Sequence, residues 1–413
     1  MNMGTATEVK DIPFGIDMRR QCFCIDENLV HTNNGSYGAT PRKVLQHMRR
    51  LQEDREMLQD VFMVKNQREY WDENLRAVCD FIGAKFENTV LIPNTTTGIN
   101  AVFKSLPLQP GDKILITNQT YNATKNICLE ASSKVEGSGV CHIDITFPIQ
   151  STEEVVSLYR DYLDQHNNVK VAVIDLISSA SALRMPLNQL IQVCKERDVI
   201  VVVDAAHSVG QVPLNVEQLG ELGADFFTAS LHKWLYTPKG CGVLWIHPKH
   251  HGIVRPAIVS HGYKQGLHNN FFFQGTHECI PLFCIGKAIE FYKDIGGLST
   301  IAKYNSALVA EGAAHLVKVW GTKHLEIPKE MEAPYMRLIK LPPLNNYPPS
   351  EILQLVADIY FKYNVIGCVV QPDNGDLWVR ISGQIWNTME DYKKLGEALL
   401  KLQAEEKQAG EPQ

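Results

Sequence analysis

The sequence lacks the features that mark membrane, secreted and nucleic-acid-binding proteins. No apolar run approaches the roughly 20 residues that a membrane-spanning helix needs, and the first thirty residues contain no basic-then-apolar signal segment. The net charge is −6 over 413 residues, so the composition indicates no basic surface for nucleic acid. We therefore expect no membrane partner and no nucleic-acid partner.

Paired cysteine motifs and nucleotide-binding motifs are also missing. The ten cysteines are scattered, and Cys22 and Cys24 have no second pair that would complete a zinc site. This pattern predicts a reducing compartment, a cytoplasmic location and no metal. The cluster His247, His250 and His251 lies in a proline-containing turn without a carboxylate, which argues against a metallohydrolase. Neither G-x-G-x-x-G nor G-x-x-x-x-G-K-[ST] occurs, so no dinucleotide or P-loop site is indicated.

Short β-branched runs alternate with amphipathic helical patterns from about residue 60 to 290. This alternation predicts an α/β fold with a mostly parallel sheet that helices cover on both faces. After about residue 295 a long helical pattern precedes short strands and a closing helix, which predicts a smaller α+β domain. We expect an N-terminal segment (1–45) that lines the site and packs on the small domain, a large domain (46–295) and a small C-terminal domain (296–408).

Polar residues follow several predicted strands at their carboxyl ends, where open α/β sheets bind ligands. Thr96 and Thr97 begin a predicted helix, where they could bind an anion or only cap the helix. Asp204 ends an apolar strand and needs a cationic or N–H partner, such as a pyridinium nitrogen, unless it caps the next turn. Lys233, beside His232, could have a lowered pKa and attack an aldehyde, or could reach out to solvent.

Two further residues extend this pattern. Tyr121 follows a predicted strand, and its ring could stack on a flat cofactor or pack in the core. Arg380 lies in the run "WVRIS", where its guanidinium could hold an α-carboxylate or form a structural ion pair. An anion cradle, a stacking ring, a carboxylate, an amine and a guanidinium together match what pyridoxal phosphate and an amino acid require.

The sequence resembles the class V, cysteine-desulfurase-like branch of the fold-type I pyridoxal-phosphate enzymes. The resemblance runs through "HTNNGSYGATP", "IPNTTTGIN", "DLISSASALRMPL", "VVVDAAHSVGQ", "ADFFTASLHKWLYTPKGCGVLW", "FFFQGTHE" and "WVRIS", and so covers nearly the whole chain. Within this branch the chain is most similar to the isopenicillin N epimerase-like group, which also contains cysteine C–S lyases. The resemblance implies a fold-type I transferase-like large domain and the cofactor pyridoxal 5'-phosphate.

The resemblance also implies a role for each matching residue. The catalytic residues would be Lys233, which would bond the cofactor aldehyde, Asp204, which would face the pyridine nitrogen, and His207. The other cofactor contacts would be Ser178 near the phenolic oxygen, Tyr121 on the ring, and Thr96, Thr97 and His232 at the phosphate. The substrate contacts would be Arg380, Asn34 and Gly35. Gly275 and Thr276 of a partner subunit would complete the phosphate site, which implies a homodimer with shared active sites.

Some positions depart from the branch. Leu176 stands where relatives often carry histidine, and His277 where many carry arginine. No stretch matches the loop that carries the persulfide-forming cysteine of true desulfurases, and Cys368 lies in a strand-like run typical of a core.

We expect β-elimination from cysteine or a cysteine derivative, a C–S lyase activity. The alternatives are epimerisation or racemisation of an amino acid, and a non-catalytic module that kept the fold. A racemase needs a second proton donor that faces the lysine, for which Tyr37 and His261 are candidates.

Overall fold

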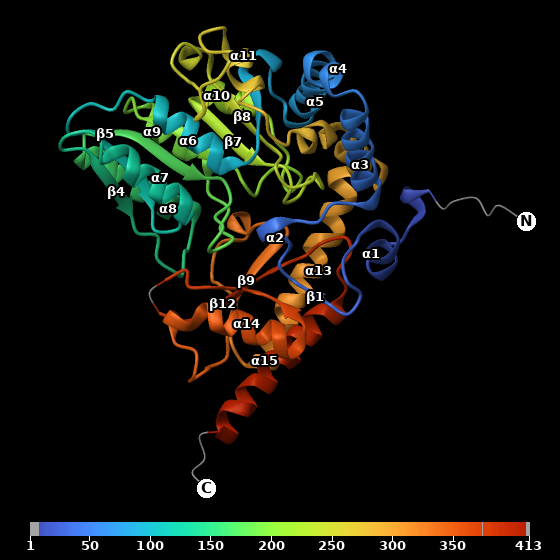
Figure 1. Ribbon diagram of the computed structural model, residues 1–413. Coiled ribbons are helices and arrows are strands. Elements are labelled where there is room, and N and C mark those ends of the chain that lie inside the picture. Colours follow the sequence, from blue (N-terminus) through green and yellow to red (C-terminus); the bar gives the residue numbers. More distant parts are fainter. Residues whose placement is uncertain (1–7, 374, 410–413) are drawn as a thin grey trace, which may run out of the picture.

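The computed structural model describes residues 8–373 and 375–409 (Figure 1). Its largest element is a seven-stranded sheet in the order β2-β8-β7-β6-β5-β3-β4, in which only β8 runs against the others. The strands are β2 (Thr89–Ile92), β3 (Lys113–Thr117), β4 (Gly139–Ile143), β5 (Val169–Asp175), β6 (Ile200–Asp204), β7 (Phe226–Ser230) and β8 (Gly242–Ile246). The predicted mostly parallel sheet is therefore confirmed.

Helices cover this sheet and connect its strands. β5, β6 and β7 are buried at almost every position, as expected for central strands that have a helix layer on each face. The helices before and between these strands are α1 (Ile16–Cys22), α2 (Asn34–Tyr37), α3 (Arg42–Met57), α4 (Gln59–Val61), α5 (Gln67–Ile82), α6 (Thr95–Ser105), α7 (Asn122–Ser132), α8 (Thr152–Gln165), α9 (Leu187–Lys195) and α10 (Val216–Leu222).

The C-terminal part of the chain forms a second layer below the large sheet (Figure 1). Its antiparallel sheet has the order β11-β12-β9, built from β9 (Met336–Lys340), β11 (Cys368–Val370) and β12 (Trp378–Ser382). The remaining helices are α11 (Leu267–Phe272), α12 (Ile285–Asp294), α13 (Gly297–Trp320), α14 (Ile352–Tyr363) and α15 (Met389–Ala409). Among the described helices, none combines the length and apolar character that a membrane span requires.

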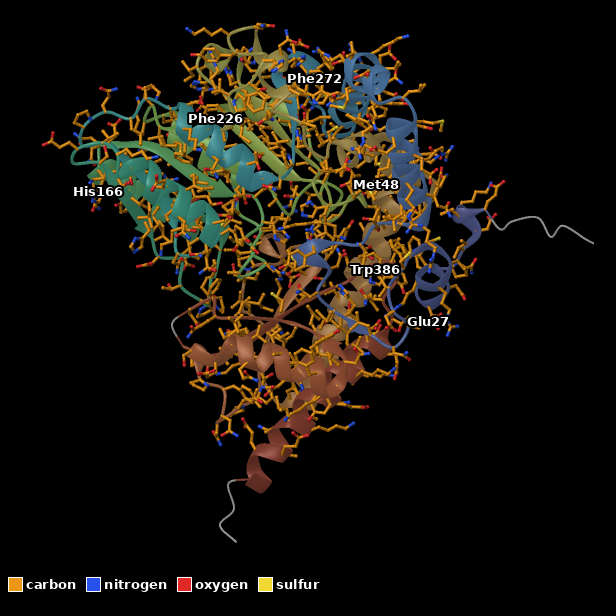
Figure 2. The ribbon with its side chains drawn as sticks, in the orientation of Figure 1. Glu27, Met48, His166, Phe226, Phe272 and Trp386 are labelled. Atoms are coloured by element: carbon orange, nitrogen blue, oxygen red, sulfur yellow. The ribbon has the colours of Figure 1, made fainter. Side chains whose placement is uncertain are left out.

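The N-terminal segment crosses from one part to the other. β1 (Val30–His31) pairs in parallel with β10 (Val365–Ile366), so the start of the chain extends the C-terminal layer. Trp386 packs against Phe23 with ring centroids 4.7 Å apart, and Phe23 in turn contacts Phe291 and Tyr236. Figure 2 places Trp386 beside this junction. The junction brings α2 close to the large sheet, and the exact domain boundaries stay a prediction.

Candidate active site

Three neighbouring strands end in the wall of one cavity. Asp175, Asp204 and Ser230 are the last residues of β5, β6 and β7, and all three line a cavity of about 280 Å³. Six of the residues expected at the site lie in the same wall, namely Thr96, Tyr121, Asp204, His207, His232 and Lys233. The carboxyl ends of these strands therefore line one cavity, where the sequence predicts the site.

Lys233 and His207 contact each other inside this cavity. The Nζ of Lys233 lies 3.0 Å from Nε2 of His207. Burial, and then the positive charge of Arg380, lower the pKa of Lys233 to about 8, while the charge of Asp204 opposes this shift. Burial, and then the charge of Lys233, lower the pKa of His207 well below its usual range. The imidazole is therefore neutral and Nε2 can accept a hydrogen bond from the amine.

Asp204 is held by two donors. Its carboxylate accepts a hydrogen bond from Oγ1 of Thr124 at 3.0 Å and one from the backbone N–H of Ala206 at 3.1 Å. Burial raises its pKa, and these donors and the charge of Lys233 lower it. Asp175 lies next to Asp204 in register, and sequence reasoning did not identify it. The sequence pattern could have identified Asp175, because Asp175 is the last residue of β5 as Asp204 is the last residue of β6.

The start of α6 faces the same cavity. Thr96 lines the wall, whereas Thr97 closes the helix cap, since its N–H donates to Oδ1 of Asn94 at 2.9 Å. His232 lies nearby with its Nδ1 buried and without a partner among the described residues. Burial lowers the pKa of His232 to about 4, so this ring is neutral too. The N-terminus of α6 and an unpartnered imidazole nitrogen suit a phosphate.

Tyr121 lines the cavity, and Arg380 lies behind the wall, in contact with the lining residue Ser179. Tyr121 is the residue before α7, and its ring is half exposed and lines the wall. Arg380 is 2% exposed, and it donates hydrogen bonds to Ser179, to Oδ1 of Asn33 at 3.1 Å and to Oγ of Ser36 at 3.2 Å. Every one of these acceptors is neutral. A buried positive charge therefore lies behind the cavity wall with no carboxylate in contact, within the described chain, to balance it.

α2 lies close to Arg380 and to Lys233. The side chain of Asn34 donates to the backbone oxygen of Lys233 at 2.9 Å, so it supports the lysine and does not line the cavity. A Cβ at Gly35 would lie 2.9 Å from Sδ of Met336 and 3.4 Å from a terminal nitrogen of Arg380. Gly35 therefore allows the backbone to approach the guanidinium closely.

Several expected residues lie outside the cavity wall. Ser178 is fully buried and donates to the backbone oxygen of Gln119 at 3.2 Å, while its neighbour Ser179 lines the cavity. Gly275 and Thr276 lie in a surface loop, half-buried and exposed, and neither lines the cavity. The two candidate proton donors also differ, because Tyr37 lines the cavity and His261 does not.

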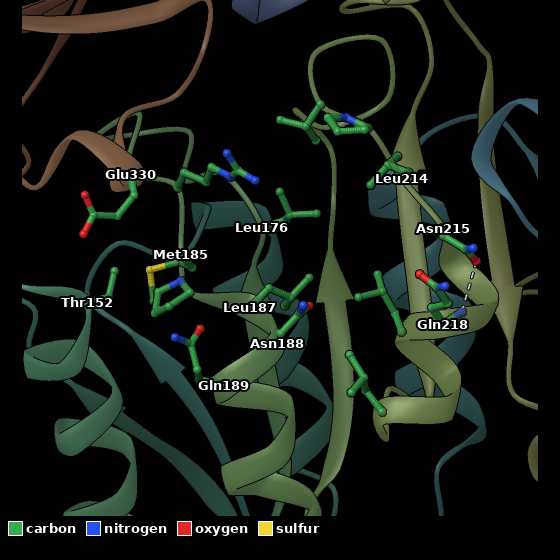
Figure 3. Close-up of a pocket in the computed structure, with 16 residues that line it drawn as sticks. Thr152, Leu176, Met185, Leu187, Asn188, Gln189, Leu214, Asn215, Gln218 and Glu330 are labelled. Atoms are coloured by element: carbon green, nitrogen blue, oxygen red, sulfur yellow. Dashed lines mark hydrogen bonds between the residues drawn. The ribbon is translucent and has the colours of Figure 1, made fainter.

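A larger cavity of about 530 Å³ has Leu176 in its wall (Figure 3). Its charged residues are Arg184 and Glu330, and neither the lysine nor the carboxylate pair lines it. Leu176 lines this second cavity and Asp175 the first, as expected for successive residues at a strand end. The position where relatives often carry histidine therefore faces away from the candidate active site.

Two other sequence features have structural explanations. Cys368 is only half-buried, not fully in the core as expected, because β11 is an edge strand of its sheet. The ring of His250 lies 2.7 Å from the carboxylate of Asp225, which also has Lys249 at 2.6 Å. Within residues 8–373 and 375–409, no group of three His, Cys, Asp or Glu side chains is arranged to hold a metal ion.

The chain belongs to the class-V aminotransferase family, whose model matches residues 39–355. It is therefore a pyridoxal 5'-phosphate-dependent enzyme. The residues present fit this cofactor, since the cavity combines an amine, a buried carboxylate, an exposed ring and a helix start with an unpartnered imidazole nitrogen.

Named relatives and solved structures are similar over nearly their whole length. A probable L-cysteine desulfhydrase of Arabidopsis thaliana is 29% identical over 91% of this chain and 83% of its own. A hercynylcysteine sulfoxide lyase of Schizosaccharomyces pombe is 25% identical over 92% and 95%. The cysteine desulfurase of Thermococcus onnurineus is 20% identical over 98% and 100%, with a TM-score of 0.74. The cystine C–S lyase C-DES is 16% identical over 90% and 97%, with a TM-score of 0.76. These two structures establish the fold.

Proposed function

We propose that this enzyme is a C–S lyase that cleaves cysteine or a cysteine derivative by β-elimination. The observation that carries the proposal is the similarity to desulfhydrases and a sulfoxide lyase over more than nine-tenths of the chain. For cysteine, the products balance as pyruvate, ammonia and hydrogen sulfide, after one water is consumed. For a substituted cysteine the substituent leaves with the sulfur.

The residues around the cavity would divide the work as follows. The bound cofactor supplies an electron sink next to the α-carbon. Lys233 would hold the cofactor at its aldehyde, and the free amine would take the α-proton at Nζ. A pKa of about 8 leaves a useful fraction of this amine neutral near pH 7. Asp204 would face the pyridine nitrogen and would keep it protonated.

The other residues would hold the cofactor and the substrate. Arg380 attracts the substrate carboxylate, because its buried charge has only neutral partners in the described chain. The cofactor contacts would be Tyr121 on the ring face, His207 and Ser178 towards the phenolic oxygen, and Thr96, Thr97 and His232 at the phosphate. Asn34 and Gly35 would shape the substrate side of the cavity.

Epimerisation is the second candidate. The isopenicillin N epimerase of Amycolatopsis lactamdurans is 24% identical over 93% of this chain and 97% of its own. An epimerase needs a donor on the face opposite Lys233, and the hydroxyl of Tyr37 is a candidate because that residue lines the cavity. Elimination is preferred because several similar relatives are named for cysteine desulfhydration.

A homodimer would complete the site. Gly275 and Thr276 lie away from their own cavity, which leaves them free to reach the phosphate site of a partner. Close to this loop, Arg55 of α3 contacts Glu278 at 3.1 Å, and the segment after Arg55 exposes Met57 and Val64 by 72% and 84%. Such exposed apolar side chains favour burial against a second copy of the chain.

Light scattering would test the dimer, with a mass of two chains as the expected result. The variant Thr276→Ala should weaken cofactor binding, and Thr146→Ala, at another exposed threonine, should not. A monomer that binds the cofactor fully would contradict the shared site.

The ten cysteines lie in the described part of the chain and none is paired. Free thiols persist in reducing compartments, which supports a cytoplasmic location. Microscopy of the full chain carrying a fluorescent tag would test this location.

One assay separates the candidate functions. Loaded enzyme is mixed with L-cysteine and with substituted cysteines, and pyruvate, sulfide and optical inversion are measured in the same samples. Elimination predicts pyruvate without inversion, epimerisation predicts inversion without pyruvate, and a non-catalytic module predicts neither.

The variant Lys233→Ala should lose all turnover, whereas Lys170→Ala, at an exposed lysine on β5, should keep it. Full activity of Lys233→Ala would rule out the proposed role of that lysine.

A further inference from the structure

Two buried carboxyl groups lie side by side in the active site, and the proposed function uses only one of them. Asp175 and Asp204 end adjacent parallel strands and are register partners, so their side chains lie on the same face of the sheet. They are 6% and 4% exposed, and both line the cavity that contains Lys233. Like charges so close and so buried are costly when both groups ionise.

Among the residues that the structure describes, neither group of this pair forms an ion pair with a basic side chain. Elsewhere in the molecule, the buried Asp225 has Lys249 at 2.6 Å and His250 at 2.7 Å. Within the described chain, Asp175 and Asp204 form no such ion pair. The positive charge of Lys233 interacts with both carboxyl groups, and one positive charge offsets at most one negative charge.

The two environments differ in a way that decides which group ionises. Asp204 accepts hydrogen bonds from Thr124 and from the backbone of Ala206. Burial, and then the charge of Asp204, raise the pKa of Asp175 well above its usual range, against weaker opposing effects of Thr120 and the Tyr121 backbone.

Apart from Asp204 and Lys233, the titratable groups that face Asp175 are neutral. Burial raises the pKa of Cys128 on α7 to about 12 and that of Tyr159 on α8 well above its usual range. No charge on these helices therefore stabilises an ionised Asp175.

We propose that Asp175 is a positioning residue that keeps its proton in the loaded enzyme, so that Asp204 alone carries the negative charge opposite the cofactor ring nitrogen. The Asp175 carboxyl also lies against Thr120 and the backbone of Tyr121, whose ring lines the same cavity. This role concerns how the cofactor is held. It goes beyond the proposed reaction and stands whether that reaction is elimination or epimerisation.

The cofactor affinities of Asp175 variants show whether the carboxyl group of Asp175 is neutral or charged in the wild type. The dissociation constant for pyridoxal 5'-phosphate is measured from the visible absorbance for the wild type, Asp175→Asn, Asp175→Ala and Asp204→Asn. The amide keeps the size and neutrality of a protonated carboxyl, so Asp175→Asn should stay within about threefold of the wild type. Asp175→Ala and Asp204→Asn should each lose about tenfold or more. An equal loss in Asp175→Asn and Asp204→Asn would overturn the proposal.

A second measurement does not depend on turnover or on affinity. The infrared spectrum of the loaded wild-type enzyme at about pH 8 should contain the C=O stretching band of a protonated carboxyl group, since an ordinary aspartic acid is fully ionised there. This band should be missing from loaded Asp175→Asn. If the wild type has no such band, the proposal is wrong, and this result needs no variant that folds.

Discussion

Replacing Arg380 by glutamine should raise the pKa of Lys233. Burial is the largest cause of the lowered pKa, and the charge of Arg380 is the second. The wild-type pKa is about 8 instead of 10.5. At pH 7 about one amine in ten is then neutral, against about one in three thousand for an ordinary lysine. Only the neutral amine attacks an aldehyde, so the rate of cofactor capture reports this fraction.

Stopped-flow absorbance gives that rate directly. The cofactor-free full chain is mixed with pyridoxal 5'-phosphate from about pH 6 to pH 10, and the midpoint of the rise in rate is compared between variants. The wild type should reach half of its maximal rate near pH 8. Arg380→Gln should have a higher midpoint, and each unit of increase should slow capture at pH 7 by about tenfold.

Two controls separate charge from geometry. Arg380→Lys keeps the positive charge but loses the planar fork, so its midpoint should stay near that of the wild type. Arg184→Gln removes an exposed charge that is not among the causes of the shift and should leave the midpoint unchanged. A folded Arg380→Gln enzyme with the wild-type midpoint would refute the reasoning.

Two substitutions test the scaffold through thermal unfolding. In Gly98→Ala, the new Cβ would lie 2.3 Å from Oγ1 of Thr228, so α6 must shift and stability should fall by about 1–3 kcal/mol. Gly286→Ala, whose Cβ meets nothing closer than 3.5 Å, is the control and should be neutral or stabilising; equal losses would contradict the packing. Asp225→Asn removes a carboxylate whose pKa in the folded protein is lower than that of an ordinary aspartate. The ionised carboxylate therefore stabilises the fold at pH values above the ordinary aspartate pKa, and this stabilisation is lost as the pH falls through the pKa of the folded state. The difference in Tm from the wild type should be large at about pH 7 and should shrink towards about pH 3, and a constant difference would contradict this.

The central sheet could be predicted from the sequence because its strands are buried on both faces. Runs such as those of β5 and β6 are almost continuously apolar, which is distinctive. β4 is harder to predict from composition, because this edge strand is mostly half-buried. The reversed direction of β8 depends on a turn and on pairing with β2, which no local pattern encodes.

The sequence indicates which strand ends carry site residues, but it does not indicate which of two successive residues lines the cavity. Ser179 lines the cavity and Ser178 does not, since successive residues of an irregular segment face different ways. Asp175 belongs to the site because β5 and β6 are neighbours with Asp175 and Asp204 in register, which the sequence alone does not show. Contacts such as that of Asn34 with the backbone of Lys233 join segments that are 199 residues apart, so only the folded chain reveals them.

The central claim is that the amine of Lys233 bonds the cofactor. The most direct measurement is borohydride reduction of the loaded enzyme, which makes that bond permanent, followed by mass spectrometry of the peptides. The account predicts a pyridoxyl group on the peptide that contains Lys233. The same group on a different lysine, with the Lys233 peptide unmodified, would contradict it.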